Sequence, residues 1–175
     1  MRTLRFEDNF RVSYSKTEFS NTVSEIPHEL VRESMLSAGI NQPLEVTTIA
    51  DVPAGTGLGS SSTLTVGLLN AFRAVSGSIS SCANLAELAC AIEIDTLGNP
   101  IGKQDQYAAA FGGMNYIRFN SDGTVRVDRI PCERDVIKHI ESHSLMIYTD
   151  QQRSASKILE KQTQGTVDKL AVLTE

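Results

Sequence analysis

The sequence predicts a domain of the α+β class, in which strands near the N-terminus are followed by a group of helices. Two observations support this class. Apolar and polar side chains alternate over residues 3–7 and 10–17, as in strands that bury one face. An apolar, β-branched run at 44–49 leads into a glycine-rich loop, and apolar residues then recur at helical spacing over 60–75.

The remaining elements follow from periodicity and from the glycines that end helices. The first two strands, with Asp8-Asn9 between them, are expected to form either a hairpin or two edge strands. In chain order the sequence then predicts a loop at 20–26, a helix at 27–38, a strand at 44–50, helices at 60–75 and 81–94, a break at 98–102, a short helix at 103–111, a hairpin of 114–119 and 124–127, a helix at 133–142, a strand at 145–148 and a helix at 152–164.

Composition excludes several classes of function. The 175 residues carry a formal net charge of −5, which argues against a nucleic-acid-binding surface. Cys82, Cys90 and Cys132 have no metal-ligand spacing, and their odd number fits a reducing compartment. No apolar run approaches the roughly 18 residues that span a membrane, and the N-terminus does not resemble a signal peptide. We therefore expect a cytoplasmic protein without a membrane partner.

The loop from Asp51 to Thr65 carries the strongest functional signal. Gly55, Gly57 and Gly59 stand at alternate positions and precede three serines. Glycine permits positive φ and close backbone approach to a ligand. Free N–H groups at the start of a helix bind anions, and serine hydroxyls can cap the helix, bind phosphate or ligate a metal. The loop therefore predicts a phosphate-binding site.

Other glycine-rich motifs fit this loop less well. A Walker A loop needs a lysine after its last glycine, and a Rossmann fingerprint needs glycine where Ser60 stands. The GxSxG pattern of a nucleophile elbow is absent. A PxxxGLGSS pattern opening a helix fits Pro53 through Ser61. A flexible glycine-serine turn without a ligand remains the alternative.

Four charged residues beyond the loop are candidates for chemistry. Glu93 can bind Mg²⁺ with a serine hydroxyl and phosphate oxygens, although a carboxylate near a helix end is commonly a solvated surface charge. Asp105, in the first turn of a helix, suits either the helix dipole or the orientation and deprotonation of a substrate hydroxyl. Lys103 and Arg153 are cations that can approach an anionic substrate, and Arg153 can equally belong to a helix cap.

Two segments resemble a known family. Residues 53–62, PAGTGLGSSS, resemble the nucleotide-phosphate motif of the GHMP kinases, the superfamily of galactokinase, homoserine kinase and mevalonate kinase. Residues 102–113, GKQDQYAAAFGG, resemble the bacterial D-glycero-D-manno-heptose 7-phosphate kinases, as do Tyr148-Thr149 and residues 153–159. The resemblance covers most of the chain from about Leu44 onward.

This resemblance implies phosphorylation of the anomeric (C1) hydroxyl of that phosphorylated heptose by ATP and Mg²⁺, which feeds nucleotide-activated heptose synthesis. It also implies a two-layer α+β domain similar to domain 2 of ribosomal protein S5. By the family pattern Ser61 and Glu93 match the Mg²⁺ ligands, and Asp105 matches the aspartate that faces the acceptor hydroxyl. The residues that would hold the ATP phosphates are Pro53, Gly55, Thr56, Gly57, Leu58, Gly59, Ser60, Ser61 and Ser62.

The family pattern further implies that the chain is incomplete at both ends. Residues 1–150 match part of the N-terminal, ATP-binding domain, and residues 151–175 match the first helix leading into a C-terminal domain. The family's N-terminal arginine motif and C-terminal glycine-rich motif have no counterpart here, so we expect little or no turnover from these residues alone. The alternatives are a galactokinase-, fucokinase- or glucuronokinase-like enzyme, or a non-catalytic nucleotide-binding scaffold of the same fold.

Overall fold

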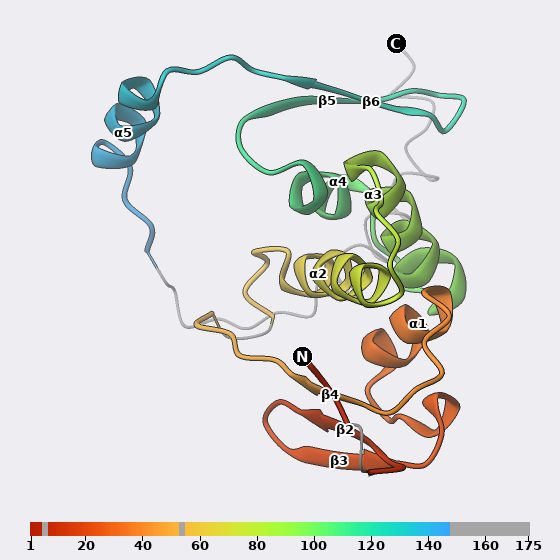
Figure 1. The fold of residues 1–175 in the computed structure, drawn as a ribbon. Helices are drawn as coiled ribbons and strands as arrows, with labels where there is room; N and C mark the ends of the chain where they lie inside the picture. Colours follow the sequence, from red (N-terminus) through yellow and green to blue (C-terminus); the bar gives the residue numbers. More distant parts are fainter. Residues whose placement is uncertain (5–6, 53–54, 148–175) are drawn as a thin grey trace.

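The structure is a computed structural model that describes residues 1–4, 7–52 and 55–147 of the chain. It confirms the α+β class. In Figure 1 a sheet of N-terminal strands lies below a group of helices, and a separate hairpin lies above them. Helix α5 stands to one side of this stack. The other helices lie between the two sheets.

Four short strands form one mixed sheet in the order β1-β4-β2-β3. Their bounds are β1 (Arg2–Thr3), β2 (Phe10–Ser13), β3 (Thr17–Ser20) and β4 (Leu44–Thr47). β2 runs parallel to β4, and the other neighbours are antiparallel. The crossover from β3 to β4 contains the 3₁₀-helix η1 (Val23–Glu25) and helix α1 (Glu29–Ser37).

The predicted N-terminal hairpin is wrong in its position. The chain reverses between β2 and β3, where the Tyr14 N–H donates to the Lys16 carbonyl at 2.8 Å, and not at Asp8-Asn9. Residues 10–17 are thus not one strand, and β1 pairs with the distant strand β4. Alternation identifies a half-buried strand but does not say which strand lies beside it, because any partner satisfies the same pattern.

One face of the sheet packs against α1 and α2 (Ser60–Val75). α2 matches the predicted helix at both ends. Alternate strand residues are buried, and they form one apolar cluster with residues of the two helices: Phe10, Val12, Leu44 and Val46 from the strands, Val31 and Met35 from α1, and Leu68 and Phe72 from α2. This cluster fixes the start of α2 relative to the end of β4, which are the two ends of the glycine loop.

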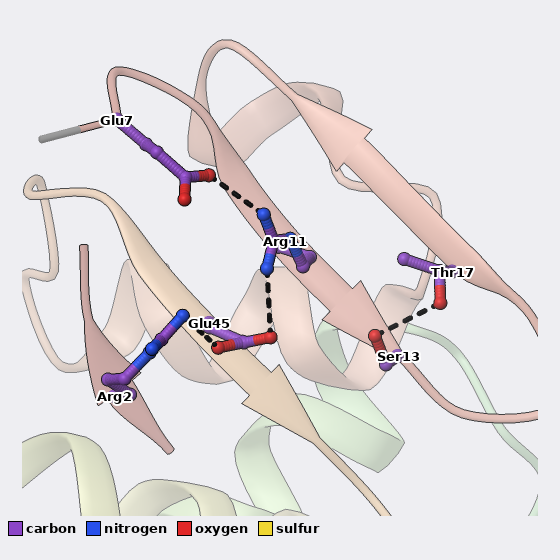
Figure 2. A network of polar contacts seen from close by, with 6 residues as sticks. All are labelled: Arg2, Glu7, Arg11, Ser13, Thr17 and Glu45. Atoms are coloured by element: carbon purple, nitrogen blue, oxygen red, sulfur yellow. Dashed lines mark hydrogen bonds and ion pairs between the residues drawn. The ribbon is translucent and has the colours of Figure 1, made fainter.

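The other face of the sheet is polar. Figure 2 shows Glu45 of β4 between two arginines, with Arg11 Nη1 at 3.1 Å and Arg2 Nη2 at 3.0 Å from its carboxylate oxygens. Arg11 also reaches Glu7 at 2.9 Å. These pairs lie in a row across β1, β4 and β2, and the arginines hold the pKa of the Glu45 carboxyl below its usual value. The network joins the three strands at the surface.

A second group of helices packs on the opposite side of α2. It consists of α3 (Cys82–Cys90), the π-helical segment η2 (Ala91–Thr96) and α4 (Gln104–Phe111). Val66 and Leu69 of α2 share an apolar cluster with Leu85, Ala89 and Ile92. The predicted helix at 81–94 is therefore confirmed, but its last part is wound as a π-helix. Segments of this kind occur frequently at functional sites.

The C-terminal part of the described chain holds the hairpin of β5 (Asn115–Phe119) and β6 (Val125–Arg129), as predicted, and helix α5 (Arg134–Ser142). The strand predicted at 145–148 is wrong over 145–147, which are exposed and outside any strand. The helix expected at 152–164 and the domain boundary after residue 150 lie outside the described residues. Within the described ranges, no helix is long and apolar enough to cross a membrane.

Candidate active site

The glycine loop connects β4 to α2 and has the backbone that its composition predicts. Gly55, Gly57 and Gly59 adopt φ values of 80°, 76° and 67°. Residues with a side chain rarely adopt this left-handed region, and an alanine there is strained by roughly 1–2 kcal/mol. Pro53, predicted to belong to the same site, lies outside the described residues.

Helix α2 begins without a side-chain cap. Its N-cap is Gly59, and the first intrahelical hydrogen bond runs from the Thr63 N–H to the Gly59 carbonyl at 2.9 Å. The helix geometry therefore leaves the N–H groups of Ser60, Ser61 and Ser62 without intrahelical acceptors. Three such donors at the positive end of a 16-residue helix dipole form a binding site for an anionic group.

A groove of about 880 Å³ runs beside this helix start. It lies between the end of β4, with Thr47 and Ile49 on its wall, and the N-terminal half of α2, where Ser60, Ser61 and Gly67 line it. This volume falls in the range of small-molecule sites. The groove thus combines an anion-binding helix end with room for a larger, partly apolar ligand.

The three serines occupy different environments. Ser60 and Ser61 are exposed and line the groove, whereas Ser62 is buried in the interior. The Ser61 carbonyl accepts the hydroxyl of the buried Thr65 at 2.9 Å. Ser60 and Ser61 are therefore the serines whose hydroxyls can reach a ligand in the groove.

Asp105 comes from α4, yet its side chain lies against the glycine loop. A Cβ built on Gly59 would lie 3.4 Å from both Cγ and Oδ2 of Asp105. Asp105 is exposed, so its carboxylate stands at the surface beside the first N–H groups of α2. The fold thus places a carboxylate next to a site for an anion.

Glu93 is fully buried, with 0% of its surface exposed. Read alone, a carboxylate near a helix end suggests a solvated surface charge, and for Glu93 that alternative is wrong. Its Oε1 accepts a hydrogen bond from Nε2 of Gln106 at 3.1 Å, while its Oε2 has no partner among the described residues. A buried carboxylate oxygen without a partner is costly, so this site fits a bound cation.

The two predicted metal ligands start from different elements, Ser61 from α2 and Glu93 from η2. No hydrogen bond joins them within the described chain. The elements themselves pack together, because Ile92 of η2 belongs to the same apolar cluster as Val66 of α2. A hydroxyl at the groove and an unpartnered buried carboxylate oxygen are both hard oxygen donors of the kind that Mg²⁺ takes.

Lys103 is directed to the hairpin. Its Nζ donates to the Gly123 carbonyl at 3.3 Å, and it lines a separate cavity of about 240 Å³ with Cys90 and Asp95. Burial raises the pKa of the Cys90 thiol to about 11, so this cysteine is a poor nucleophile at neutral pH. The other predicted substrate cation, Arg153, lies outside the described residues.

Gln106 is the site residue that the sequence does not single out. It is fully buried, and its amide touches Glu93, while the preceding residue is the exposed Asp105. The segment GKQDQYAAAFGG contains Gln106, but the pattern carries no signal for a buried amide. A signal exists in the helical spacing, because Gln106 lies one turn before the half-buried Ala109 and Ala110.

Comparison with known proteins places this geometry in a family. A family model described as the GHMP kinases N terminal domain matches residues 21–113, more than half of the chain. The chain belongs to the GHMP kinases. The matched region contains the glycine loop, Glu93 and Asp105, so the candidate site lies within this GHMP kinase domain.

Individual relatives agree with this assignment. The chain is 38% identical over 113 residues to a D-glycero-alpha-D-manno-heptose 7-phosphate kinase of Campylobacter jejuni, covering 65% of this chain and 33% of that protein. It is 29% identical over 144 residues to the bifunctional fucokinase/GDP-fucose pyrophosphorylase of Arabidopsis thaliana, covering 77% of this chain and 14% of that protein. The GHMP kinase chain thus spans a third or less of the length of these curated relatives.

Two solved structures share the fold. A D-glycero-D-manno-heptose 1-phosphate kinase from Bacteroides thetaiotaomicron superposes with a TM-score of 0.74 at 30% identity, over 81% of this chain and 50% of that one. A putative sugar kinase from Campylobacter jejuni gives a TM-score of 0.66 at 26% identity, over 79% of this chain and 48% of that one. These similarities show that the relatives of this GHMP kinase domain are sugar kinases.

Proposed function

We propose that the chain carries the ATP-phosphate site of a sugar kinase, which transfers the γ-phosphoryl group of ATP to the anomeric hydroxyl of D-glycero-D-manno-heptose 7-phosphate. The observation that carries this proposal is the approach of Asp105 to Gly59. It puts a carboxylate beside an uncapped helix start, which is the arrangement that phosphoryl transfer to a hydroxyl requires. We also place the reaction in the cytoplasm, where ATP is available.

The start of α2 suits the triphosphate. Phosphoryl transfer depends on charge neutralisation and positioning more than on covalent chemistry. The N–H groups of Ser60, Ser61 and Ser62 supply fixed donors, and the positive φ values of the loop glycines let the backbone approach the phosphates closely. The adjoining groove of about 880 Å³ has room for the nucleoside.

Asp105 suits the acceptor. In the proposed step its carboxylate accepts the proton of the anomeric hydroxyl while that oxygen bonds to the γ-phosphorus. The bond from the γ-phosphorus to the bridging oxygen breaks, and ADP leaves with that oxygen. An anomeric hydroxyl is more acidic than an ordinary alcohol, so a carboxylate is a sufficient base.

We assign the Mg²⁺ ligands as Oε2 of Glu93, which is buried without a partner among the described residues, and the hydroxyl of Ser61, which lines the groove. When bound, the cation neutralises charge on the transferring phosphates. The contribution of the chain is to hold Glu93 in the interior with one oxygen already hydrogen-bonded and the other available. We keep Lys103 and Arg153 as proposed contacts to the acceptor. The hydrogen bond from Lys103 to the Gly123 carbonyl does not favour this role for Lys103.

The choice of acceptor rests on the relative in Campylobacter jejuni, which is named for heptose 7-phosphate and is 38% identical. The similarity to a fucokinase makes another sugar the second candidate. A panel of heptose 7-phosphate, fucose, galactose and glucuronate in the same assay separates the two. Transfer to the heptose phosphate above the others is the expected result.

The test incubates the chain with ATP, Mg²⁺ and the heptose phosphate over long times, and follows ³¹P resonances. We expect Mg²⁺-dependent ATP binding and slow formation of a phosphate coupled to the anomeric proton. A product phosphorylated at another carbon would contradict the anomeric assignment. Absence of ATP binding would contradict the donor site, and ATP binding without any sugar binding would favour the scaffold.

A further inference from the structure

We propose that Gln106 is a positioning residue for the cation site. Its amide group orients the Glu93 carboxylate and ties it to the helix that carries Asp105. This inference rests on the function proposed above, in which Glu93 is a Mg²⁺ ligand. It adds a residue whose role is to present Glu93 in one orientation and to couple the cation site to the acceptor side.

The hydrogen bond is made between two buried side chains. Glu93 and Gln106 both have 0% of their surface exposed, and Nε2 of Gln106 lies 3.1 Å from Oε1 of Glu93. A carboxylate bonded through one oxygen has its plane fixed, and its other oxygen then points in a set direction. That other oxygen, Oε2, is the one without a partner among the described residues.

The amide has an unpartnered oxygen of its own. Oε1 of Gln106 is buried and, within the described chain, makes no hydrogen bond. Leaving a buried polar atom unsatisfied typically costs about 1–3 kcal/mol, so a side chain that served only to fill space would be better replaced by an apolar one. Two adjacent side chains that each keep a free oxygen form an environment suited to a hard cation and its waters.

The position of Gln106 in α4 links two parts of the site. Asp105 and Gln106 are consecutive in the first turn of the helix, with Asp105 exposed against Gly59 and Gln106 buried against Glu93. The first turn of α4 therefore fixes two groups: it places the Asp105 carboxylate beside α2, and it orients the Glu93 carboxylate of η2. A shift of α4 would move both groups together.

The experiment compares Gln106→Met with Gln104→Met. Methionine keeps the length and volume of glutamine but removes the amide donor. Gln104 is exposed on the same helix, so it provides a control with the same change of residue type. Mn²⁺ affinity is measured in the presence of ATP from the electron paramagnetic resonance signal of free Mn²⁺, and ATP affinity is measured separately in EDTA.

We expect Gln106→Met to weaken Mn²⁺ binding about 10- to 100-fold, which is the usual effect of losing a partner that orients a metal ligand. ATP affinity in EDTA should stay within about twofold of the unmodified chain, and Gln104→Met should change neither quantity. In a Glu93→Gln background, Gln106→Met should cause no further loss of Mn²⁺ affinity, because Gln106 acts through Glu93. A purely structural role would lower both affinities.

Two results overturn the inference alone: unchanged Mn²⁺ affinity in Gln106→Met, or a full additional loss in the Glu93→Gln background. Failure of the unmodified chain to bind Mn²⁺ with ATP overturns the proposed function and the inference with it. Should the methionine variant not fold, Gln106→Asn is measured instead. Its donor is one methylene too short for the 3.1 Å hydrogen bond, so the same loss is expected, and normal Mn²⁺ affinity would refute the role.

Discussion

Gly59→Ala perturbs the contact on which the candidate site depends. Gly59 has φ of +67°, and an alanine in this left-handed region costs about 1–2 kcal/mol. The new Cβ would also meet Asp105 Cγ and Oδ2 at 3.4 Å. Since 3.4 Å is a van der Waals separation and Asp105 is exposed, we expect the methyl group to change the surroundings of the carboxylate with little further loss of stability.

Gly57→Ala is the matched control. Gly57 has φ of +76°, and an added Cβ there meets no atom of the described residues within 4 Å. Both variants should therefore lose about 1–2 kcal/mol of unfolding free energy in urea denaturation. Only Gly59→Ala should shift the side-chain carboxyl resonance of Asp105 in ¹³C NMR spectra. Equal shifts in both variants, or an undiminished stability of Gly59→Ala, would refute this reasoning.

Three further predictions concern other parts of the molecule. In a complete kinase that contains this domain, Asp105→Asn should slow phosphoryl transfer by about 10²- to 10⁴-fold and leave ATP affinity nearly unchanged, as measured by ³¹P NMR and calorimetry. Glu45→Gln should lower thermal stability at neutral pH. Arg11 and Arg2 depress the pKa of Glu45 in the folded state, so the ionised carboxylate stabilises the fold above the usual carboxyl pKa. This stabilisation is lost as the pH falls through the lower, folded-state pKa. Below that pH the melting temperatures of the variant and the unmodified chain should converge. Gly67→Ala should raise stability by about 0.5–1 kcal/mol, because Gly67 lies inside α2 and an added Cβ meets no described atom within 4 Å. It should also weaken ATP binding, because the new methyl group enters the groove.

The sequence predicts the central elements of the fold well. Helix α2 begins and ends where the periodicity and Gly77 place it, and the β5–β6 hairpin surrounds the expected turn. These elements are specified by local signals: apolar spacing for the helix, and a Ser-Asp-Gly turn for the hairpin. Strand pairing near the N-terminus is not local, so the expected hairpin gives β1 the wrong neighbour.

The candidate site likewise has one part that the sequence predicts and another that it does not. The anion-binding start of α2 follows from the order of glycines and serines, because backbone conformation there depends on the glycines themselves. The burial of Glu93 and its contact with Gln106 depend on how η2 and α4 pack, and helical spacing assigns Gln106 to the inner face of α4 without indicating its partner. The approach of Asp105 to Gly59 likewise exists only in three dimensions.

The central claim is that the start of α2 and Glu93 together bind ATP with a divalent cation. Calorimetric titration of ATP into the chain, with Mg²⁺ and with EDTA, tests it most directly, with Glu93→Gln measured alongside. The unmodified chain should bind ATP more tightly when Mg²⁺ is present, and Glu93→Gln should bind it equally in both conditions. A Glu93→Gln variant that keeps the full Mg²⁺ enhancement, or an unmodified chain that does not bind ATP, would contradict the claim.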